Sequence, residues 1–92
     1  MPLYARKRDS NEREIIEALR SLGCFVIQEN NIDLYVLPPG RQEWIPLEVK
    51  GERGKLTTYQ TDLHATLHHN YGYTVPVVVT IDDALKAVGL LK

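Results

Sequence analysis

The feature that most constrains this fold is a pair of apolar segments separated by a short turn. IDLYVL at 32–37 and EWIPLEVK at 43–50 flank the segment PPGRQ, whose prolines and glycine favour a turn. Polar and apolar residues alternate in both segments, which predicts two β-strands. We therefore expect an antiparallel hairpin with one face turned toward an apolar core.

The expected register gathers charge on one face of this hairpin. A turn centred between Gly40 and Arg41 places Asp33 opposite Glu48, and Lys50 follows on the same face. Like charges directly across an antiparallel pair destabilise a sheet, so two facing carboxylates beside a lysine invite a cation. This face comprises Asp33, Tyr35, Trp44, Glu48 and Lys50, and the other comprises Ile32, Leu34, Val36, Ile45, Leu47 and Val49.

Pro46 lies inside the second strand, where it cannot donate a hydrogen bond to a neighbouring strand. We expect a bulge or a missing partner there, and a pairing shifted by one residue is the alternative. Trp44 could stack on a nucleic-acid base or simply pack against the sheet. For the triplet Glu48–Val49–Lys50 alone, the simpler interpretation is an ion pair on a solvated edge.

The remaining elements complete an α/β (α+β) domain. The pattern predicts helices at 9–22, 57–70 and 82–90 and further strands at 24–28 and 75–80. The order αβββαβα corresponds to a mixed four-stranded sheet flanked by helices, in one domain spanning 1–92. The strand at 75–80 is apolar enough to be buried on both faces and should pair in parallel through a right-handed crossover.

The helix at 57–70 carries two stripes of side chains. Thr57 and Gln60 have capping-box spacing. Tyr59, Leu63 and Leu67 form the stripe expected to face the core, and Gln60, His64 and His68 form a second one. Histidines four residues apart could bind zinc, or they could be ordinary surface residues.

Composition sets broad limits. The chain has 92 residues, 43% hydrophobic and 25% charged, which suits one small globular domain. No apolar run reaches membrane-spanning length, and the N-terminal segment lacks the apolar stretch of a signal peptide. Cys24 is the single cysteine and is expected to be a buried core residue of a reducing compartment. We therefore expect a cytoplasmic protein with no membrane partner.

The net charge of -1 does not itself indicate a nucleic-acid partner, but basic residues cluster locally. A phosphate-binding surface needs only local positive charge, although such clusters are often merely solvated. Residues 1–8 are expected to form a basic N-terminal arm. The candidate DNA contacts are Arg6, Lys7, Arg8, Arg53, Lys55 and His64.

Glu12 adds a third carboxylate. At 100° per residue it lies within the apolar stripe formed by Ile15, Ile16 and Leu19. One interpretation is a capping-box partner of Asp9. The other is a buried acid that needs a partner or a metal ion, since an unpaired buried charge is costly.

These residues suit metal-assisted phosphodiester hydrolysis. Mg²⁺ prefers carboxylate, carbonyl and water oxygens, so Asp33, Glu48 and the backbone carbonyl of Val49 are the candidate ligands, with Glu12 binding directly or through water. Mn²⁺ is the expected substitute. Lys50 could orient the nucleophile or stabilise charge on the phosphate.

The chain resembles the PD-(D/E)XK nucleases, and most closely the small stand-alone VRR-NUC proteins of phages and bacteria. NEREIIEALRSLGCFV, IDLYV, PLEVKGERGKLTTYQ and YGYTVPVVV follow the segments of that family in order. The resemblance implies a metal site at Asp33 and Glu48, assistance from Glu12, a catalytic Lys50 and a functional Gln60. The chain departs from the motif at Ile32, where a proline is usual.

The function implied by this resemblance is a Mg²⁺-dependent, structure-specific DNA endonuclease. The expected cell is bacterial or phage-infected, and the expected substrate is a four-way (Holliday) junction cut by a homodimer, because a two-fold dimer matches the symmetry of that junction. Flaps and other branched DNA are alternative substrates. A non-catalytic DNA-binding or assembly module that keeps the fold is the alternative function.

Overall fold

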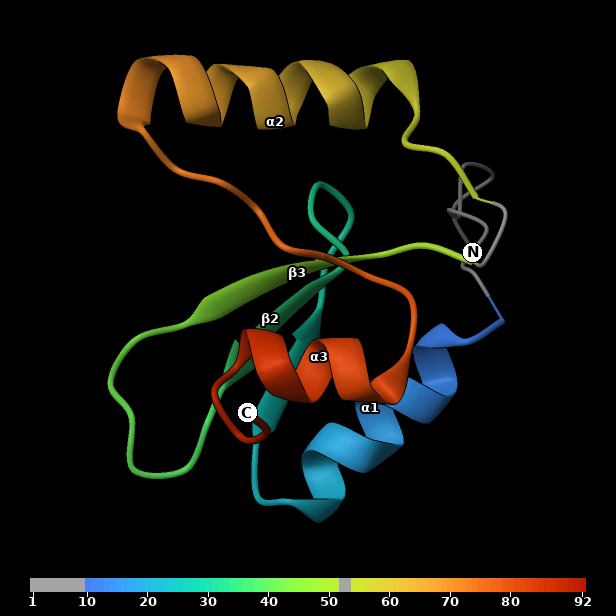
Figure 1. Ribbon diagram of the computed structural model, residues 1–92, viewed down its shortest axis with the longest axis vertical. Coiled ribbons are helices and arrows are strands. Elements are labelled where there is room, and N and C mark those ends of the chain that lie inside the picture. Colours follow the sequence, from blue (N-terminus) through green and yellow to red (C-terminus); the bar gives the residue numbers. More distant parts are fainter. Residues whose placement is uncertain (1–9, 52–53) are drawn as a thin grey trace.

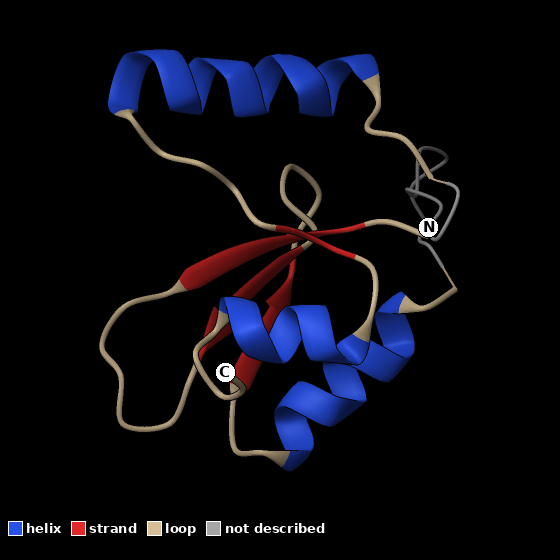
Figure 2. Ribbon diagram, in the orientation of Figure 1, coloured by secondary structure: helices blue, strands red, loops and turns tan. Residues whose placement is uncertain are grey.

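The computed structural model describes residues 10–51 and 54–92 and has an α+β architecture. Its elements are α1 (Glu12–Ser21), β1 (Phe25–Gln28), β2 (Leu34–Leu37), β3 (Ile45–Val49), α2 (Thr58–Tyr71), β4 (Val77–Val78) and α3 (Ile81–Ala87). The sheet order is β1-β2-β3-β4, with antiparallel pairing up to β3 and parallel pairing of β3 with β4 (Figure 2). The predicted order of elements and the mixed four-stranded sheet are confirmed.

The hairpin of β2 and β3 has the predicted register. Leu34 pairs with Leu47, and the same register extended by one residue places Asp33 opposite Glu48. Leu34 and Leu47 are fully buried on the core side. The side chains of Asp33 and Glu48 therefore lie on the opposite face of the sheet, as the alternation of polar and apolar residues predicted.

Pro46 does not shift the register of β2 and β3, because its nitrogen points toward β4, where β3 needs no hydrogen bond at this position. It pairs with Tyr35 in the unshifted register. The N–H of Glu48 donates to the carbonyl of Pro76 on the β4 side. Alternate residues of a strand direct their backbone groups to the same side, so the nitrogen of Pro46 also points toward β4. The β4 ladder begins only opposite Glu48, beyond this position.

The helices lie on both sides of the sheet. Helices α1 and α3 cover one face, and α2 lies across the other (Figure 1). The core between the sheet and α1 and α3 consists of Ile15, Ile16, Leu19, Cys24, Val26, Leu34, Val36, Leu47, Val49, Val78, Ala84 and Val88. Cys24 is buried as expected, and burial raises the pKa of its thiol. Among the described residues, no helix is both long and apolar enough to cross a bilayer.

Two expectations for the fourth strand, its length and its burial on both faces, were wrong. The fourth strand covers only Val77 and Val78 and is not buried on both faces, because Val77 is half-exposed. Val77 pairs with Glu48 and so shares its side of the sheet. The strand lies at the edge of the sheet.

The packing of α2 also differs from expectation. Tyr59, placed on the core-facing stripe, is 58% exposed, and Leu63 and Leu67 are only partly buried. Gln60 is the one buried residue of this helix. The helix is thus rotated so that Gln60 and His64 face the sheet, because the buried carboxylate of Glu48 requires hydrogen-bond donors.

Helix α1 begins later than predicted. Its first residue is Glu12 and its N-cap is Asn11, whereas Asp9 lies outside the described residues. Glu12 therefore stands at the first helical position, and a capping box would require the third. The capping-box interpretation of Glu12 is wrong.

Candidate functional site

The centre of the candidate site is the carboxylate of Glu48, which has 0% exposure. Strand β3 directs this side chain toward α2. Its Oε2 accepts a hydrogen bond from Nε2 of Gln60 at 3.0 Å. Its Oε1 lies 3.1 Å from Nε2 of His64. Helix α2 therefore supplies a hydrogen-bond partner for each oxygen of the carboxylate.

The start of α2 fixes how Gln60 meets this carboxylate. The N–H of Thr57 donates to Oε1 of Gln60 at 3.0 Å, and the hydroxyl of Thr57 accepts from the backbone N–H of Gln60. A backbone N–H can only donate, so the atom that it contacts must be the amide oxygen. The NH₂ group of Gln60 must then face Glu48. The predicted capping box is confirmed, and it orients a side chain of the site.

His64 meets Glu48 as a neutral imidazole. Burial lowers the pKa of His64, and the positive charge of Lys50 lowers it further. Neutral His64 can donate its Nε2–H to Oε1 of Glu48, which makes the contact a hydrogen bond rather than an ion pair.

The titration of His64 is the first testable consequence. By proton NMR, its midpoint should lie below 6.5, the ordinary value for histidine. Because the unfolded chain binds this proton more readily, folding stability should fall as the pH decreases through 6.5 toward the folded midpoint. The His64→Gln variant identifies the signal and should lose this component of the pH dependence. A midpoint above 6.5 would mean that His64 is charged beside Glu48.

Asp33 lies just before β2 and is also buried, with 3% exposure. Its Oδ2 accepts a hydrogen bond from the backbone N–H of Val49 at 2.8 Å. The side chain thus continues the β2–β3 pairing where β2 has not yet begun. The N–H and carbonyl of one residue in a strand point to the same side, so the carbonyl of Val49 also faces Asp33.

The oxygen atoms of this site are compatible with Mg²⁺ in its usual hydrated form. Asp33, Glu48 and the carbonyl of Val49 are oxygen ligands of the kind that this ion prefers. In the described part of the chain, however, no three His, Cys, Asp or Glu side chains form a group that could hold a metal ion. Mg²⁺ commonly binds through one or two carboxylates and retains several waters. The residues therefore fit a hydrated ion and not an ion enclosed by protein.

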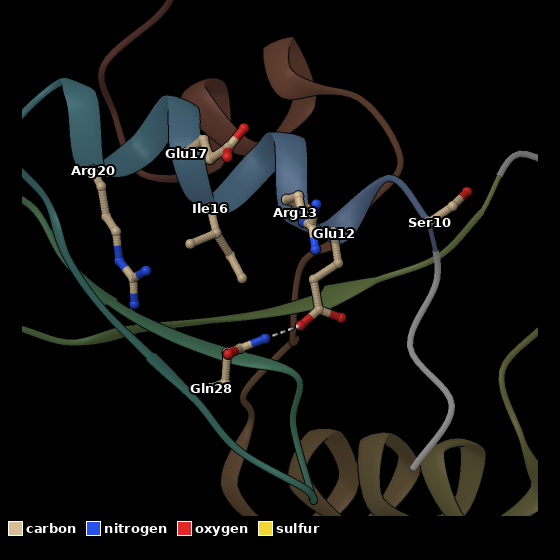
Figure 3. A pocket seen from close by; sticks show the side chains of 7 residues that line it. All are labelled: Ser10, Glu12, Arg13, Ile16, Glu17, Arg20 and Gln28. Atoms are coloured by element: carbon tan, nitrogen blue, oxygen red, sulfur yellow. Dashed lines mark hydrogen bonds between the residues drawn. The ribbon is translucent and has the colours of Figure 1, made fainter. Parts of the chain in front are cut away.

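Glu12 is the first residue of α1 and contacts Gln28 of β1. It is 3% exposed, and its Oε2 accepts a hydrogen bond from Nε2 of Gln28 at 3.1 Å (Figure 3). Gln28 pairs with Leu34, which belongs to the core face. Glu12 opens onto a hollow of about 680 Å³ lined by Ser10, Glu12, Arg13, Ile16, Glu17, Arg20 and Gln28. The structure does not bring Glu12 into a metal-binding group with Asp33 and Glu48.

Most of the predicted DNA contacts cannot be placed. Arg6, Lys7, Arg8 and Arg53 lie outside the described residues, and Lys55 is exposed. His64 contacts Glu48 instead of lying free on the surface. His68 is exposed and belongs to no described metal-binding group, so the zinc interpretation has no support.

Trp44 lies at the surface of the sheet face that carries Glu48. It is half-exposed and meets the ring of Phe25 edge to face, with ring centroids 6.0 Å apart. It is therefore not a core residue.

Sequence reasoning missed one further residue, Asn11, whose side chain donates hydrogen bonds to the carbonyls of Lys50 and Val79, directly after β3 and β4. Its only sequence signal was a residue type common at helix N-caps.

No protein-family model, curated protein or solved structure matches this chain. Any functional conclusion therefore depends on the chemistry of the site.

Proposed function

We propose that this protein is a metal-dependent endodeoxyribonuclease of the PD-(D/E)XK type that hydrolyses phosphodiester bonds. The observation that carries the proposal is the burial of two carboxylates, Asp33 just before β2 and Glu48 in β3, which the β2–β3 register extended by one residue places opposite each other, with Lys50 directly after β3. Buried carboxylates opposite each other require compensation by donors or by a cation. Lys50, directly after β3, supplies positive charge that stabilises an anionic substrate.

Each residue has a distinct role. Asp33, Glu48 and the carbonyl of Val49 would hold the Mg²⁺ ion. The bound ion would supply positive charge for the phosphate and make a water more acidic. The ammonium of Lys50 stabilises negative charge that develops on the phosphate oxygens. Gln60 acts as a positioning residue, since it donates to Oε2 of Glu48 at 3.0 Å and is itself held by Thr57.

His64 has a role at Glu48 in addition to the phosphate contact expected from the sequence. Its neutral ring donates to Glu48, so it orients this carboxylate together with Gln60. The carboxylate retains further lone pairs beyond those used by the two donors. Glu48 can therefore contact both α2 and a cation.

One observation favours a second candidate function. Both oxygens of Glu48 already have hydrogen-bond partners on α2, and these two donors can compensate the buried carboxylate without a cation. A non-catalytic DNA-binding or assembly module would be compatible with such a site. Cleavage activity separates the two candidates.

The preferred substrate is branched DNA in the bacterial or phage-infected cytoplasm, cut by a homodimer. A two-fold dimer would place one site on each side of a four-way junction, whose symmetry it shares. Flaps and other branches are alternative substrates of the same chemistry. The basic residues at 6–8, with Arg53 and Lys55, are the proposed phosphate contacts.

The decisive experiment is cleavage of labelled four-way, flap and linear DNA in Mg²⁺, in Mn²⁺ and in EDTA. We expect metal-dependent cleavage with four-way junctions cut fastest. Binding should weaken with salt, by a log–log slope of about -0.9 for each phosphate neutralised. An identically prepared Asp33→Asn protein controls for contaminating nucleases. DNA binding without cleavage in either metal would favour the non-catalytic module, and a monomer by light scattering would remove the dimer.

A further inference from the structure

The aromatic side chains of this protein lie outside its core. None of those in the described part of the chain belongs to the apolar core cluster, which consists of aliphatic side chains and Cys24. Aromatic residues normally supply much of the buried area of a core. Here Phe25 is 62% exposed and Trp44 is 44% exposed. Exposed apolar residues are ordinary when they are scattered singly, and they indicate a binding site when they form a patch.

Phe25 and Trp44 belong to one patch on the sheet. Phe25 pairs with Leu37, and the β2–β3 register extended along the hairpin places Leu37 opposite Trp44. The rings of Phe25 and Trp44 meet with centroids 6.0 Å apart. Ile27 and Tyr35 pair in the next row across the strands. We call the side chains of these five residues the aromatic face.

The aromatic face adjoins the candidate site. Its members alternate along the strands with core residues, so they lie on the same side of the sheet as Glu48. Helix α2 contacts Glu48 on this side and leaves Phe25 and Trp44 exposed. Trp44 precedes Glu48 by four residues, which is about 13 Å along a strand. A stacked nucleic-acid strand advances about 3.4 Å per nucleotide, so a strand cleaved at Glu48 would reach Trp44 within about four nucleotides.

The size of the aromatic face distinguishes a small flat ligand from a second copy of the chain. Since an aromatic side chain offers about 150–250 Å², the face at its observed exposure presents on the order of 300–400 Å². A stable protein–protein interface takes about 800 Å² from each partner, so the face alone is too small for a dimer. Aromatic rings are the surfaces on which nucleic-acid bases stack. Area and ring type therefore favour bases.

We propose that the aromatic face binds unpaired nucleotides next to the cleaved phosphodiester, with their bases stacked on Phe25 and Trp44. The role of these nucleotides as substrate rests on the proposed nuclease function. Bases inside a duplex already stack on one another, so only unpaired nucleotides can offer a free face to the protein. The substrate class is thus DNA in which unpaired nucleotides adjoin the cut, as they do in a flap or at an opened branch point.

Trp44 reports base stacking directly, because it is the only tryptophan of the chain. The experiment uses the full chain in EDTA, where no metal-dependent cleavage occurs. An oligothymidylate should quench the fluorescence of Trp44 in a saturable way. A blunt-ended duplex with the same number of phosphates should quench it much less.

Leucine substitutions separate base stacking from apolar packing, because leucine keeps an apolar surface but has no aromatic ring. By anisotropy of a labelled oligothymidylate, Phe25→Leu and Trp44→Leu should each weaken binding about 5- to 150-fold, the effect of losing one stacked base. Trp44→Phe should bind nearly as well as the wild type. Tyr71→Leu is the matched control and should bind unchanged, since Tyr71 is 76% exposed but belongs to α2 and not to the aromatic face. None of these variants should alter the affinity for the duplex.

The outcomes are separable. Unchanged affinity of both leucine variants for the oligothymidylate overturns the proposal, and so does an equal loss of affinity for the duplex. A fluorescence of Trp44 that does not respond to saturating oligothymidylate also overturns it. If Phe25→Ser converts a wild-type dimer into a monomer by light scattering, a second copy occupies the face and the proposal is overturned. Stacking without cleavage in Mg²⁺ or Mn²⁺ would overturn the proposed nuclease function and retain the aromatic face as a surface that binds single strands.

Discussion

Substitution of Glu48 by glutamine is expected to release helix α2 from the sheet while the rest of the fold remains intact. Glutamine has the same shape but carries no negative charge, so the hydrogen bonds from Gln60 and His64 lose their charge-assisted strength. Hydrogen bonds to charged groups contribute about 1.5–3 kcal/mol each. Gln60 is the one buried residue of α2, so its contact with Glu48 holds the helix at the sheet, together with the hydrogen bond from the hydroxyl of Tyr59 to Oδ1 of Asn31 at 2.7 Å.

Hydrogen exchange measures this release directly. In Glu48→Gln, amides 61–71 should exchange at least tenfold faster, which corresponds to about 1.4 kcal/mol of lost local stability. Core amides of β2 and α1 should change much less. Glu43→Gln is the matched control, since Glu43 is an exposed glutamate just before β3. Unchanged protection of α2 in Glu48→Gln would show that other contacts hold the helix.

Substitution of Lys50 by alanine is expected to lower the cleavage rate about 10²–10³-fold, the usual effect of losing one preorganised electrostatic group. DNA affinity should change little, because one lysine is a small part of the phosphate contacts. The pKa of His64 should rise without reaching 6.5, since burial is the larger of its two causes and remains in the variant.

Lys55→Ala is the matched control for this variant, because Lys55 is exposed in the segment that follows β3. It should affect salt-dependent DNA binding and leave the cleavage rate of bound DNA unchanged. Full cleavage by Lys50→Ala, in a preparation whose Asp33→Asn counterpart is inactive, would remove Lys50 from the mechanism.

The sequence was sufficient to predict the hairpin and its register. Alternation with a period of two decides which side chains share a face, and the turn decides which residues pair. Asp33 and Glu48 could therefore be placed on one face before the structure was known. Pro46 left this prediction uncertain, because the side to which its nitrogen points depends on where β4 pairs.

The docking of α2 could not be predicted in the same way. Two stripes compete on this helix, and the pattern favours the more apolar one that contains Tyr59. The outcome was decided by Glu48, a distant residue whose burial is not evident from the sequence of α2. The contacts of Asn11 were invisible for a related reason, since they cross 39 and 68 residues of chain.

The separation of α2 from the apolar core has a consequence for how the chain folds. The core cluster draws on the sheet, α1 and α3 and includes no residue of α2. A folding nucleus built from apolar contacts would form without α2, and the helix would join the sheet after the main barrier has been crossed. Substitutions at Gln60 or His64 should then accelerate unfolding and hardly slow refolding, with φ-values near zero. The part of the molecule that completes the candidate site is thus the last to assemble and the first to detach.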